Sequence, residues 1–294
     1  MENNDAGTKR GKKRLIFWLI LFIVCVIVAA GCLGVWVYHM VLRKAMDDLY
    51  DQARVELPVD SNVPNAGKNE NTNKDKTDDT AIETNYPGYE TLEDPPENEP
   101  MVRINFELLK QTSANVYAWI EIPGTEVAFP IVQHPKNNEY YLRRAINGAY
   151  DITGCIYTQN YNSLDFSDDN TIIYGHYMDD GTKFGSLLSY MDEDFFKNHR
   201  RIDIYTETHW YSYEVFAALP FDTRHILRSY KRVNDPYEAF LDDVYSSKDA
   251  RTIIADDSMA DADTDRIITL STCLKTGSRR YLVLAKLVKS QLCE

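Results

Sequence analysis

Three short stretches of the sequence carry side chains that together could perform acyl transfer. His176 follows the β-like run 171–174 after one glycine, Cys273 ends a second β-like run, and Arg279 and Arg280 stand at the start of a third. A thiol becomes a strong nucleophile when a base or a positive neighbour favours its thiolate. An arginine can hold a carbonyl oxygen and the charge that develops on it. These residue types at strand ends predict a cysteine enzyme whose nucleophile is Cys273.

The same residues also have ordinary structural interpretations. A single cysteine in an apolar strand is more often part of the core, and single histidines and strand-opening arginines are more often surface groups. Cys273 differs because the polar sequence Lys-Thr-Gly-Ser follows it, which predicts a position at the mouth of the fold. We interpret four other histidines as surface or structural groups: His134, His199, His209 and His225.

The sequence after residue 100 has the pattern of a mainly β domain. Its short apolar runs are rich in β-branched and aromatic residues and are bounded by Gly, Pro, Asn or Asp, as strands are. About eight strands in this length favour a closed β-barrel or a sandwich, and composition alone does not choose between them. The predicted strands are 118–122, 127–132, 153–158, 171–174, 201–206, 211–219, 266–272 and 281–288.

A few short helices are predicted among these strands. Asn105 can cap one helix, and Asp235 can cap another that has proline at its first position. Two further helices are predicted over 138–144 and over 184–197, the second broken near Asp192. They are too short and too few to make this a mixed α/β fold.

The N-terminal part predicts a membrane anchor. Residues 15–40 are almost wholly apolar, longer than the ~20 residues that span a bilayer and the ~7–15 of a cleaved signal peptide. Basic residues cluster in the preceding tail, 1–14, and acidic residues dominate after the apolar run. By the positive-inside rule we expect a single-pass protein of the cell membrane, with a cytoplasmic N-terminus and an extracellular catalytic domain.

The charge of the chain limits its partners. The formal net charge is −13, and residues 41–100 read as an acidic flexible linker before the domain 101–294. The stretch 65–80 has no large apolar residue, so it cannot bury enough surface to offset chain entropy. Since phosphate binding needs clustered Lys and Arg, an acidic domain argues against nucleic acid as a partner.

The cysteines do not form a framework. There are five, and two of them, Cys25 and Cys32, lie in the apolar N-terminal run. Cys155, Cys273 and Cys293 have none of the close spacings typical of metal sites. The sequence therefore predicts neither a metal centre nor a disulfide scaffold.

Taken with their order and spacing, these motifs resemble the sortase family of bacterial transpeptidases. The resemblance rests on Thr-Leu-Ser-Thr-Cys273 followed by Arg280-Tyr-Leu-Val, with Tyr-Gly-His176 about a hundred residues upstream. Further segments resemble class B sortases and extend the likeness over 101–290. They are Asn138-Glu-Tyr-Tyr-Leu142, Ile146-Asn-Gly148, Gly154-Cys-Ile-Tyr157, Tyr-Gly-His-Tyr-Met178 and Phe184-Gly-Ser-Leu187.

The resemblance implies an eight-stranded β-barrel, no obligatory cofactor, and cleavage of a C-terminal sorting signal through a Cys thioester. It implies that secreted surface proteins are the substrates, and that an amine of a peptidoglycan precursor or of a pilin is the acceptor. Cys273 would be the nucleophile, His176 the general acid and base, and Arg280 the clamp of substrate and oxyanion. The peptide groove would be lined by Asn138, Leu142, Tyr174 and Ser271.

Two features depart from the family pattern. Cys155 stands where the family more often has serine or another small residue, and we interpret it as a buried strand thiol. The doublet Arg279–Arg280 offers two candidate clamps, although neighbouring side chains in a strand point to opposite faces. Arg280 directly precedes Tyr-Leu-Val, as in the family, so we expect Arg280 to be the clamp and Arg279 to be solvated in the preceding loop.

Two other functions remain open on the sequence. A cell-wall cysteine peptidase or amidase would use Cys273 and His176 but would need no arginine. A catalytically silent binding domain on a stalk would need none of the three. An amine acceptor separates the first alternative from a transpeptidase, and selective labelling of Cys273 by a thiol reagent argues against the second.

Overall fold

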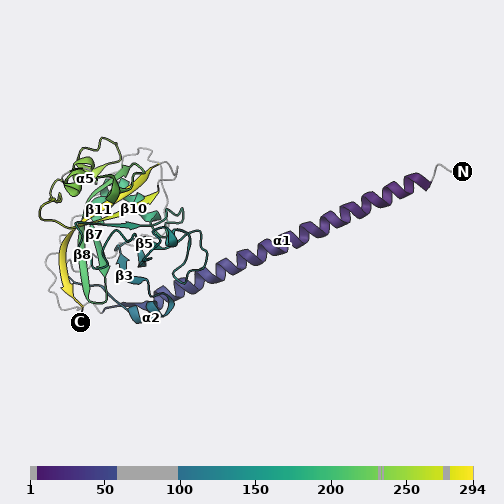
Figure 1. Cartoon of the computed structure of the whole chain (residues 1–294), viewed down its shortest axis with the longest axis horizontal. Coiled ribbons are helices and arrows are strands. Elements are labelled where there is room, and N and C mark those ends of the chain that lie inside the picture. Colours follow the sequence, from purple (N-terminus) through teal and green to yellow (C-terminus); the bar gives the residue numbers. More distant parts are fainter. Residues whose placement is uncertain (1–4, 58–98, 231–232, 234, 274–278, 294) are drawn as a thin grey trace, which may run out of the picture. The chain divides into compact units, whose positions relative to one another are not determined.

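The protein is described here by a computed structural model, in which residues 5–57, 99–230, 233, 235–273 and 279–293 are described (Figure 1). The chain divides into two compact units, Met1–Asp51 and Gln52–Glu294. The first contains most of helix α1, Asp5–Ala53. The second contains all the strands.

Helix α1 carries the predicted anchor. Its segment Phe17–Ala53 is the one helix in the described residues that is long and apolar enough to cross a membrane. Large apolar side chains along it are exposed, among them Phe17, Trp18 and Ile27. Such exposure suits a lipid surrounding, because soluble proteins rarely expose contiguous apolar patches of this size. The predicted anchor 15–40 falls within α1. The helix also extends into the predicted tail before the anchor and into the predicted linker after it.

The second unit is a closed β-barrel with few helices, as predicted. Within the described residues the sheet order is β11-β10-β6-β5-β4-β3-β7-β8-β9, and an additional pairing of β11 with β8 closes eight strands into a barrel. The short strand β9 (Ile253–Ile254) is added outside this ring, on β8. The eight strands are β3 (Val116–Glu121), β4 (Ala128–Gln133), β5 (Ile156–Thr158), β6 (Asn170–Tyr174), β7 (Arg201–Tyr205), β8 (His209–Phe221), β10 (Ile267–Cys273) and β11 (Arg280–Leu292).

Alternation along β11 shows how the barrel is filled. Tyr281, Val283 and Ala285 belong to the interior core, together with Ile268 and other buried strand residues. The intervening side chains Leu282 and Leu284 belong to a second apolar cluster, together with residues of helix α5 (Pro236–Tyr245). Both faces of β11 are thus buried over 281–285, which explains the continuous apolar sequence of this part of the strand.

Local capping fixes the helices where the sequence predicted them. Asn105 accepts a hydrogen bond from Leu108 N at the start of α2 (Phe106–Thr112). Asp235 accepts from two backbone N–H groups at the start of α5. Asp192 caps α3 and marks the predicted break. The remaining short helices are η1 (Tyr140–Arg143), η2 (Gly185–Met191), α3 (Glu193–Asn198) and α4 (Ile226–Ser229).

The residues directly after α1 belong to the β unit. Strand β1 (Arg54–Glu56) pairs antiparallel with β2 (Val102–Ile104), and backbone hydrogen bonds extend the pairing at Leu57 N–Met101 O and at Asn105 N–Ala53 O. The predicted linker therefore begins with ordered elements, helix to Ala53 and strand from Arg54. The rest of it, 58–98, lies outside the described residues.

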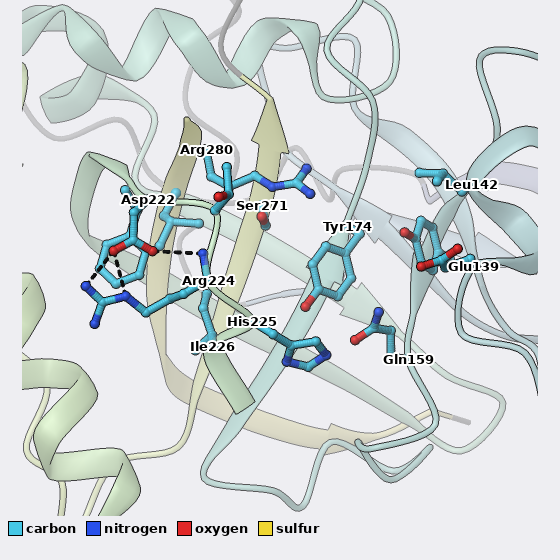
Figure 2. A pocket seen from close by; sticks show the side chains of 14 residues that line it. Glu139, Leu142, Gln159, Tyr174, Asp222, Arg224, His225, Ile226, Ser271 and Arg280 are labelled. Atoms are coloured by element: carbon cyan, nitrogen blue, oxygen red, sulfur yellow. Dashed lines mark hydrogen bonds and ion pairs between the residues drawn. The ribbon is translucent and has the colours of Figure 1, made fainter. Parts of the chain in front are cut away.

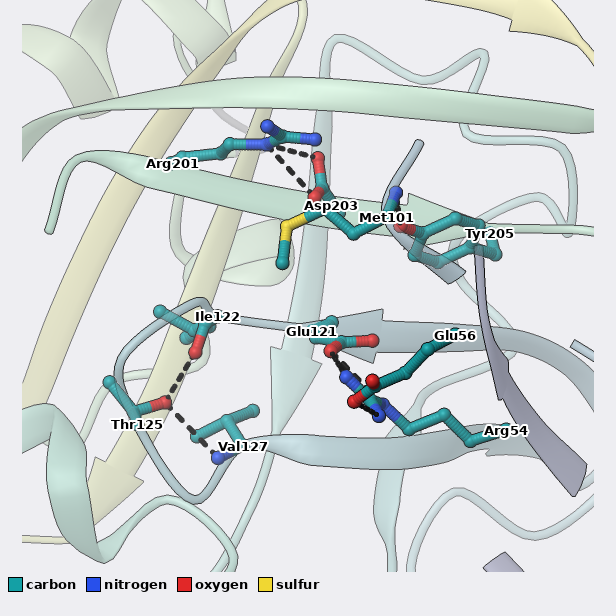
Figure 3. A network of polar contacts seen from close by, with 10 residues as sticks. All are labelled: Arg54, Glu56, Met101, Glu121, Ile122, Thr125, Val127, Arg201, Asp203 and Tyr205. Atoms are coloured by element: carbon teal, nitrogen blue, oxygen red, sulfur yellow. Dashed lines mark hydrogen bonds and ion pairs between the residues drawn. The ribbon is translucent and has the colours of Figure 1, made fainter. Parts of the chain in front are cut away.

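Strand β1 also contributes to a group of ion pairs, called here the charge cluster: Arg54, Glu121, Arg201 and Asp203 (Figure 3). Arg54 donates from Nε and Nη2 to the buried Glu121 carboxylate, with Nε–Oε1 at 3.1 Å. Arg201 Nε donates to both oxygens of Asp203, which is fully buried. Burial raises the pKa of Asp203 to about 6, against the opposing effect of Arg201. In this cluster every arginine has a carboxylate partner.

Candidate active site

Strand register brings the three predicted catalytic residues to one edge of the barrel. β10 and β11 are antiparallel, with Cys273 directly opposite Arg280. β10 and β6 are parallel, with Ser271 paired to Tyr174, and Gly175 N continues the ladder by donating to Ser271 O at 3.2 Å. His176 follows Tyr174 by two residues, and β6 is the strand next to the one that ends in Cys273. We call Cys273, His176 and Arg280 the thiol edge.

Arg280 is directed at the thiol. Its Nη1 donates to Cys273 Sγ at 3.0 Å, and both side chains are half-buried. Among the described residues no carboxylate forms an ion pair with Arg280. A guanidinium in this position contacts the thiol through one N–H and has further donors for an oxyanion.

Arg279 has different partners. Its Nη1 donates to Asp249 Oδ2 at 2.7 Å, and its Nη2 donates to Pro220 O at 3.3 Å. The Arg279 side chain is 40% exposed, and the sequence did not predict these two contacts. Asp249 accepts hydrogen bonds from both Arg251 and Arg279. These contacts lower the pKa of Asp249 well below its usual range.

The imidazole of His176 is anchored on the opposite wall of the site. His176 Nε2 lies 2.6 Å from the backbone oxygen of Leu142 in η1. A carbonyl oxygen can only accept, so Nε2 carries the proton and donates it. Nδ1 is then the nitrogen that can take up or release a proton.

A pocket of about 210 Å³ adjoins the thiol edge (Figure 2). Arg280 extends into it next to Ser271 and Tyr174, while Leu142 and Glu139 form the far wall. The end of β8 and the residues that follow it form another wall of the pocket. The lining residues are Glu139, Leu142, Tyr157, Gln159, Tyr174, Phe221, Asp222, Thr223, Arg224, His225, Ile226, Ser271, Arg280 and Leu282.

Two tyrosines give the pocket an aromatic, uncharged floor. The rings of Tyr157 and Tyr174 stack with centroids 5.5 Å apart. Burial raises the pKa of Tyr157 to about 12, although the positive charge of Arg280 opposes this. Burial also raises the pKa of Tyr174. Both hydroxyls stay neutral near pH 7, so neither competes with Cys273 as an anion.

Of the four groove residues that the resemblance implies, Leu142, Tyr174 and Ser271 line this pocket. Asn138 is not among the lining residues in the described part of the chain. Its Oδ1 accepts a hydrogen bond from Asn160 N at 2.8 Å, which fixes the loop beside Glu139.

The pocket wall formed by residues 221–226 was not predicted from the sequence. His225 was interpreted as an ordinary surface or structural histidine, but it is half-buried, lines the pocket and contacts the Tyr161 ring edge-on at 5.2 Å. No local pattern marks this segment. It reaches the site because Phe221 pairs with Arg280 across β8 and β11, a contact between residues 59 positions apart.

Cys155 has the surroundings of a structural thiol. It is 2% exposed, and its Sγ donates to Arg144 O at 3.1 Å. Burial raises the pKa of Cys155 to about 12, so almost no thiolate exists at neutral pH. Cys155 is buried, as interpreted from the sequence, but it lies directly before β5 (Ile156–Thr158) and not in the strand. It is a poor rival to Cys273.

The chain resembles known proteins in sequence and structure. Residues 120–288 match the sortase domain family. Sortase B of Staphylococcus aureus (strain NCTC 8325 / PS 47) is 30% identical over 192 residues, 64% of this chain and 76% of the relative. Sortase B of Listeria monocytogenes serovar 1/2a (strain ATCC BAA-679 / EGD-e) is 33% identical over 172 residues, 58% of this chain and 68% of the relative.

Solved structures give the same result. A crystal structure of sortase B from B. anthracis in complex with AAEK2 has a TM-score of 0.56 and 34% identity, covering 64% of this chain and 85% of that one. A Staphylococcus aureus sortase B–substrate complex has a TM-score of 0.54 and 30% identity, covering 63% and 84%. The likeness extends over most of the β unit.

Proposed function

Since the chain belongs to the sortase family, in its class B branch, we propose that it is a membrane-anchored cysteine transpeptidase acting on secreted proteins with a C-terminal sorting signal. The family supports a transpeptidase. The residues that perform the reaction, its substrates, its acceptor and its place in the cell are our proposal. The observation that carries it is the hydrogen bond from Arg280 to the Cys273 thiol at the edge where His176 follows the neighbouring strand.

In the proposed reaction Cys273 Sγ attacks the carbonyl carbon before the scissile peptide bond, and its proton passes to His176. The C–S bond forms, the oxyanion is held by Arg280, and the C–N bond then breaks as His176 protonates the leaving amine. An incoming amine then attacks the thioester and gives a proton to His176. The new C–N bond forms, the C–S bond breaks, and His176 returns the proton to the sulfur, which restores the thiol. No step needs a metal or an organic cofactor.

The pocket beside the thiol would hold the peptide before the scissile bond. Leu142, Tyr174 and Ser271 offer it an apolar wall, a ring face and a hydroxyl. Asn138 would contact the same peptide next to this wall, beyond Glu139. The acceptor amine would belong to a peptidoglycan precursor or to a pilin.

Helix α1 supports a location in the cell membrane. The basic residues before the apolar run support a cytoplasmic N-terminus, with the catalytic unit outside. Membrane-held substrate and lipid-linked acceptor would then share one plane with the enzyme, which raises their effective concentration. The proposed catalytic unit includes strand β1 and so begins near Gln52, before the boundary at 101 that the sequence predicted.

An acyl-transfer assay tests this function. The purified chain would be incubated with a library of sorting-signal peptides, with and without an added amine such as triglycine. We expect cleavage that depends on Cys273 and a product that contains the amine. Cleavage to the free acid alone, unaffected by the amine, would favour the cysteine peptidase or amidase. The absence of both cleavage and selective labelling of Cys273 would favour a silent binding domain.

A further inference from the structure

The imidazole of His176 needs an external support to keep one orientation. Its backbone is held by the ladder hydrogen bond of Gly175 to Ser271 O and by Phe184 N, which donates to His176 O at 3.0 Å. The ring itself has one hydrogen bond in the described residues, to Leu142 O at 2.6 Å. The position of that carbonyl therefore determines which ring nitrogen is free for proton transfer.

The Leu142 carbonyl belongs to η1, a single short turn that lies against Gly154 and is hydrogen-bonded to Cys155. Cys155 N donates to Tyr141 O at 3.0 Å, and Cys155 Sγ donates to Arg144 O at 3.1 Å. These two bonds fix Tyr141, directly before Leu142, and Arg144, two residues after it. A turn of four residues has little stability of its own, so these contacts decide its position.

Gly154 approaches the same carbonyl so closely that no side chain fits. Its φ is +58°, and a Cβ at this position would lie 2.5 Å from Leu142 O and 2.7 Å from Tyr141 O. Both contacts are with backbone, which cannot rotate aside. A left-handed φ is also costly for any residue with a Cβ.

We propose that Gly154 and Cys155 are positioning residues for His176. They hold the η1 turn so that Leu142 O accepts the proton of Nε2, and Nδ1 is left as the nitrogen that exchanges a proton with the thiol and the leaving amine. This inference rests on the proposed function, because it gives His176 its role. It also gives a task to Cys155, which departs from the usual residue of the family.

The test uses the full chain in detergent, with Gly154→Ala compared to Gly124→Ala. Gly124 also has a positive φ, +75°, but a Cβ there would meet only the His199 side chain. We expect Gly154→Ala to lower kcat at least about tenfold with KM changed less than about threefold, because a misplaced group costs rate more than binding. The pH profile of kcat/KM should also change for this variant alone. Equal losses in the two variants, or an unchanged pH profile for Gly154→Ala, would overturn the proposal.

A second pair guards against misfolding of the glycine variant. Cys155→Ser keeps a donor for Arg144 O, whereas Cys155→Val fills similar space without one. We expect the serine variant to keep kcat within about threefold and the valine variant to lose about tenfold, as for other groups that orient a reacting residue. If valine performs as well as serine, the thiol hydrogen bond has no positioning role and the inference fails for Cys155.

A chemical readout separates this inference from the proposed function. Diethyl pyrocarbonate modifies unprotonated imidazole nitrogens, and mass spectrometry of the peptide that contains His176 gives its rate without any turnover. Release of Nε2 from Leu142 O should raise that rate in Gly154→Ala and leave it unchanged in Gly124→Ala. A wild-type chain that neither cleaves nor transfers would refute the proposed function alone. An unchanged modification rate in Gly154→Ala would refute the positioning role alone.

Discussion

The thiol edge and the charge cluster both hold half-buried arginines beside buried strands, but these arginines have different partners. Arg54 and Arg201 face the carboxylates of Glu121 and Asp203. Arg280 faces a thiol and a pocket. An arginine neutralised by a carboxylate stabilises the fold around it, whereas one without a carboxylate keeps its donors for a substrate. The difference separates the part of the barrel that supports the fold from the part proposed to carry the chemistry.

Replacing the thiol should have the largest effect on activity. We expect Cys273→Ala to abolish cleavage and transfer, since removal of a nucleophile costs on the order of 10⁶ in kcat. The melting temperature should stay close to that of the wild type, because Cys273 lies at the end of β10 and is only half-buried. Peptide cleavage followed by mass spectrometry measures the first, and a thermal melt the second.

Cys293→Ala is the control for that variant, because Cys293 is also a free cysteine and is exposed. It should leave turnover unchanged. Persisting turnover in Cys273→Ala would move the nucleophile elsewhere, and Cys155 would be examined next despite its raised pKa.

Replacing the His176 imidazole should have the second-largest effect on activity. Loss of a general acid and base costs ~10²–10⁴ in rate, so we expect His176→Ala to fall in that range of kcat. His209→Ala, at the start of β8 and distant from the site in strand register, should keep full activity. His225→Ala should change KM more than kcat, because His225 lines the pocket without being part of the thiol edge. Activity of His176→Ala within a few-fold of wild type would remove His176 from the reaction.

The two neighbouring arginines make a sharper comparison within the same loop–strand junction. Arg280→Lys should lower kcat/KM at least about tenfold, since a lysine lacks the planar fork of donors that can reach both thiol and oxyanion. Arg279→Lys should stay within about threefold, because a lysine can still pair with Asp249. Both are measured with one peptide at one pH, beside their melting temperatures.

The reverse ranking of the two arginines would mean that Arg279 is the clamp. If neither change matters, arginine-assisted acyl transfer itself is refuted, and the cysteine hydrolase becomes the better explanation.

Local features of the fold could be predicted from the sequence because their causes are local. Asn105, Asp192 and Asp235 cap helices through hydrogen bonds to residues two or three positions away. Alternation along β11 likewise follows the local period of a strand, with Leu282 and Leu284 in one apolar cluster and Tyr281 in the other. Closure into a barrel could not be decided this way, because it depends on the pairing of β8 with β11 across more than 50 residues.

The same limit applies to the site. Cys273, His176 and Arg280 could be singled out because each ends or opens a strand with a reactive side chain. The wall 221–226 and the support of His176 by Leu142 depend on long-range pairing, so nothing in their own sequence indicates them. Arg54 was assigned to a linker for the same reason, since its partner Glu121 is 67 residues away.

The smallest expected effect on activity, with a clear effect on stability, concerns Arg54 and the start of the catalytic unit. A chain that begins at 101 lacks β1 and leaves the buried Glu121 carboxylate without Arg54. Leaving a buried charged group unpaired costs about 1–3 kcal/mol or more, so we expect 101–294 to be less stable than 52–294 by roughly this amount. Urea unfolding measures the difference, and kcat/KM should agree within about twofold because the charge cluster does not contact the pocket residues named above.

A double-mutant comparison isolates the ion pair from the rest of β1. In 52–294, Arg54→Ala should cost about 1–3 kcal/mol, because the Glu121 side chain stays buried without its arginine partner. Glu121→Gln should rescue part of the stability of Arg54→Ala and of 101–294, since a neutral amide is easier to bury than an unpaired carboxylate. Equal stability of 52–294 and 101–294 would restore the predicted boundary at residue 101. A rescue by Glu121→Gln with no loss of kcat/KM would show that charges at this position stabilise the barrel and have no part in the reaction at the thiol edge.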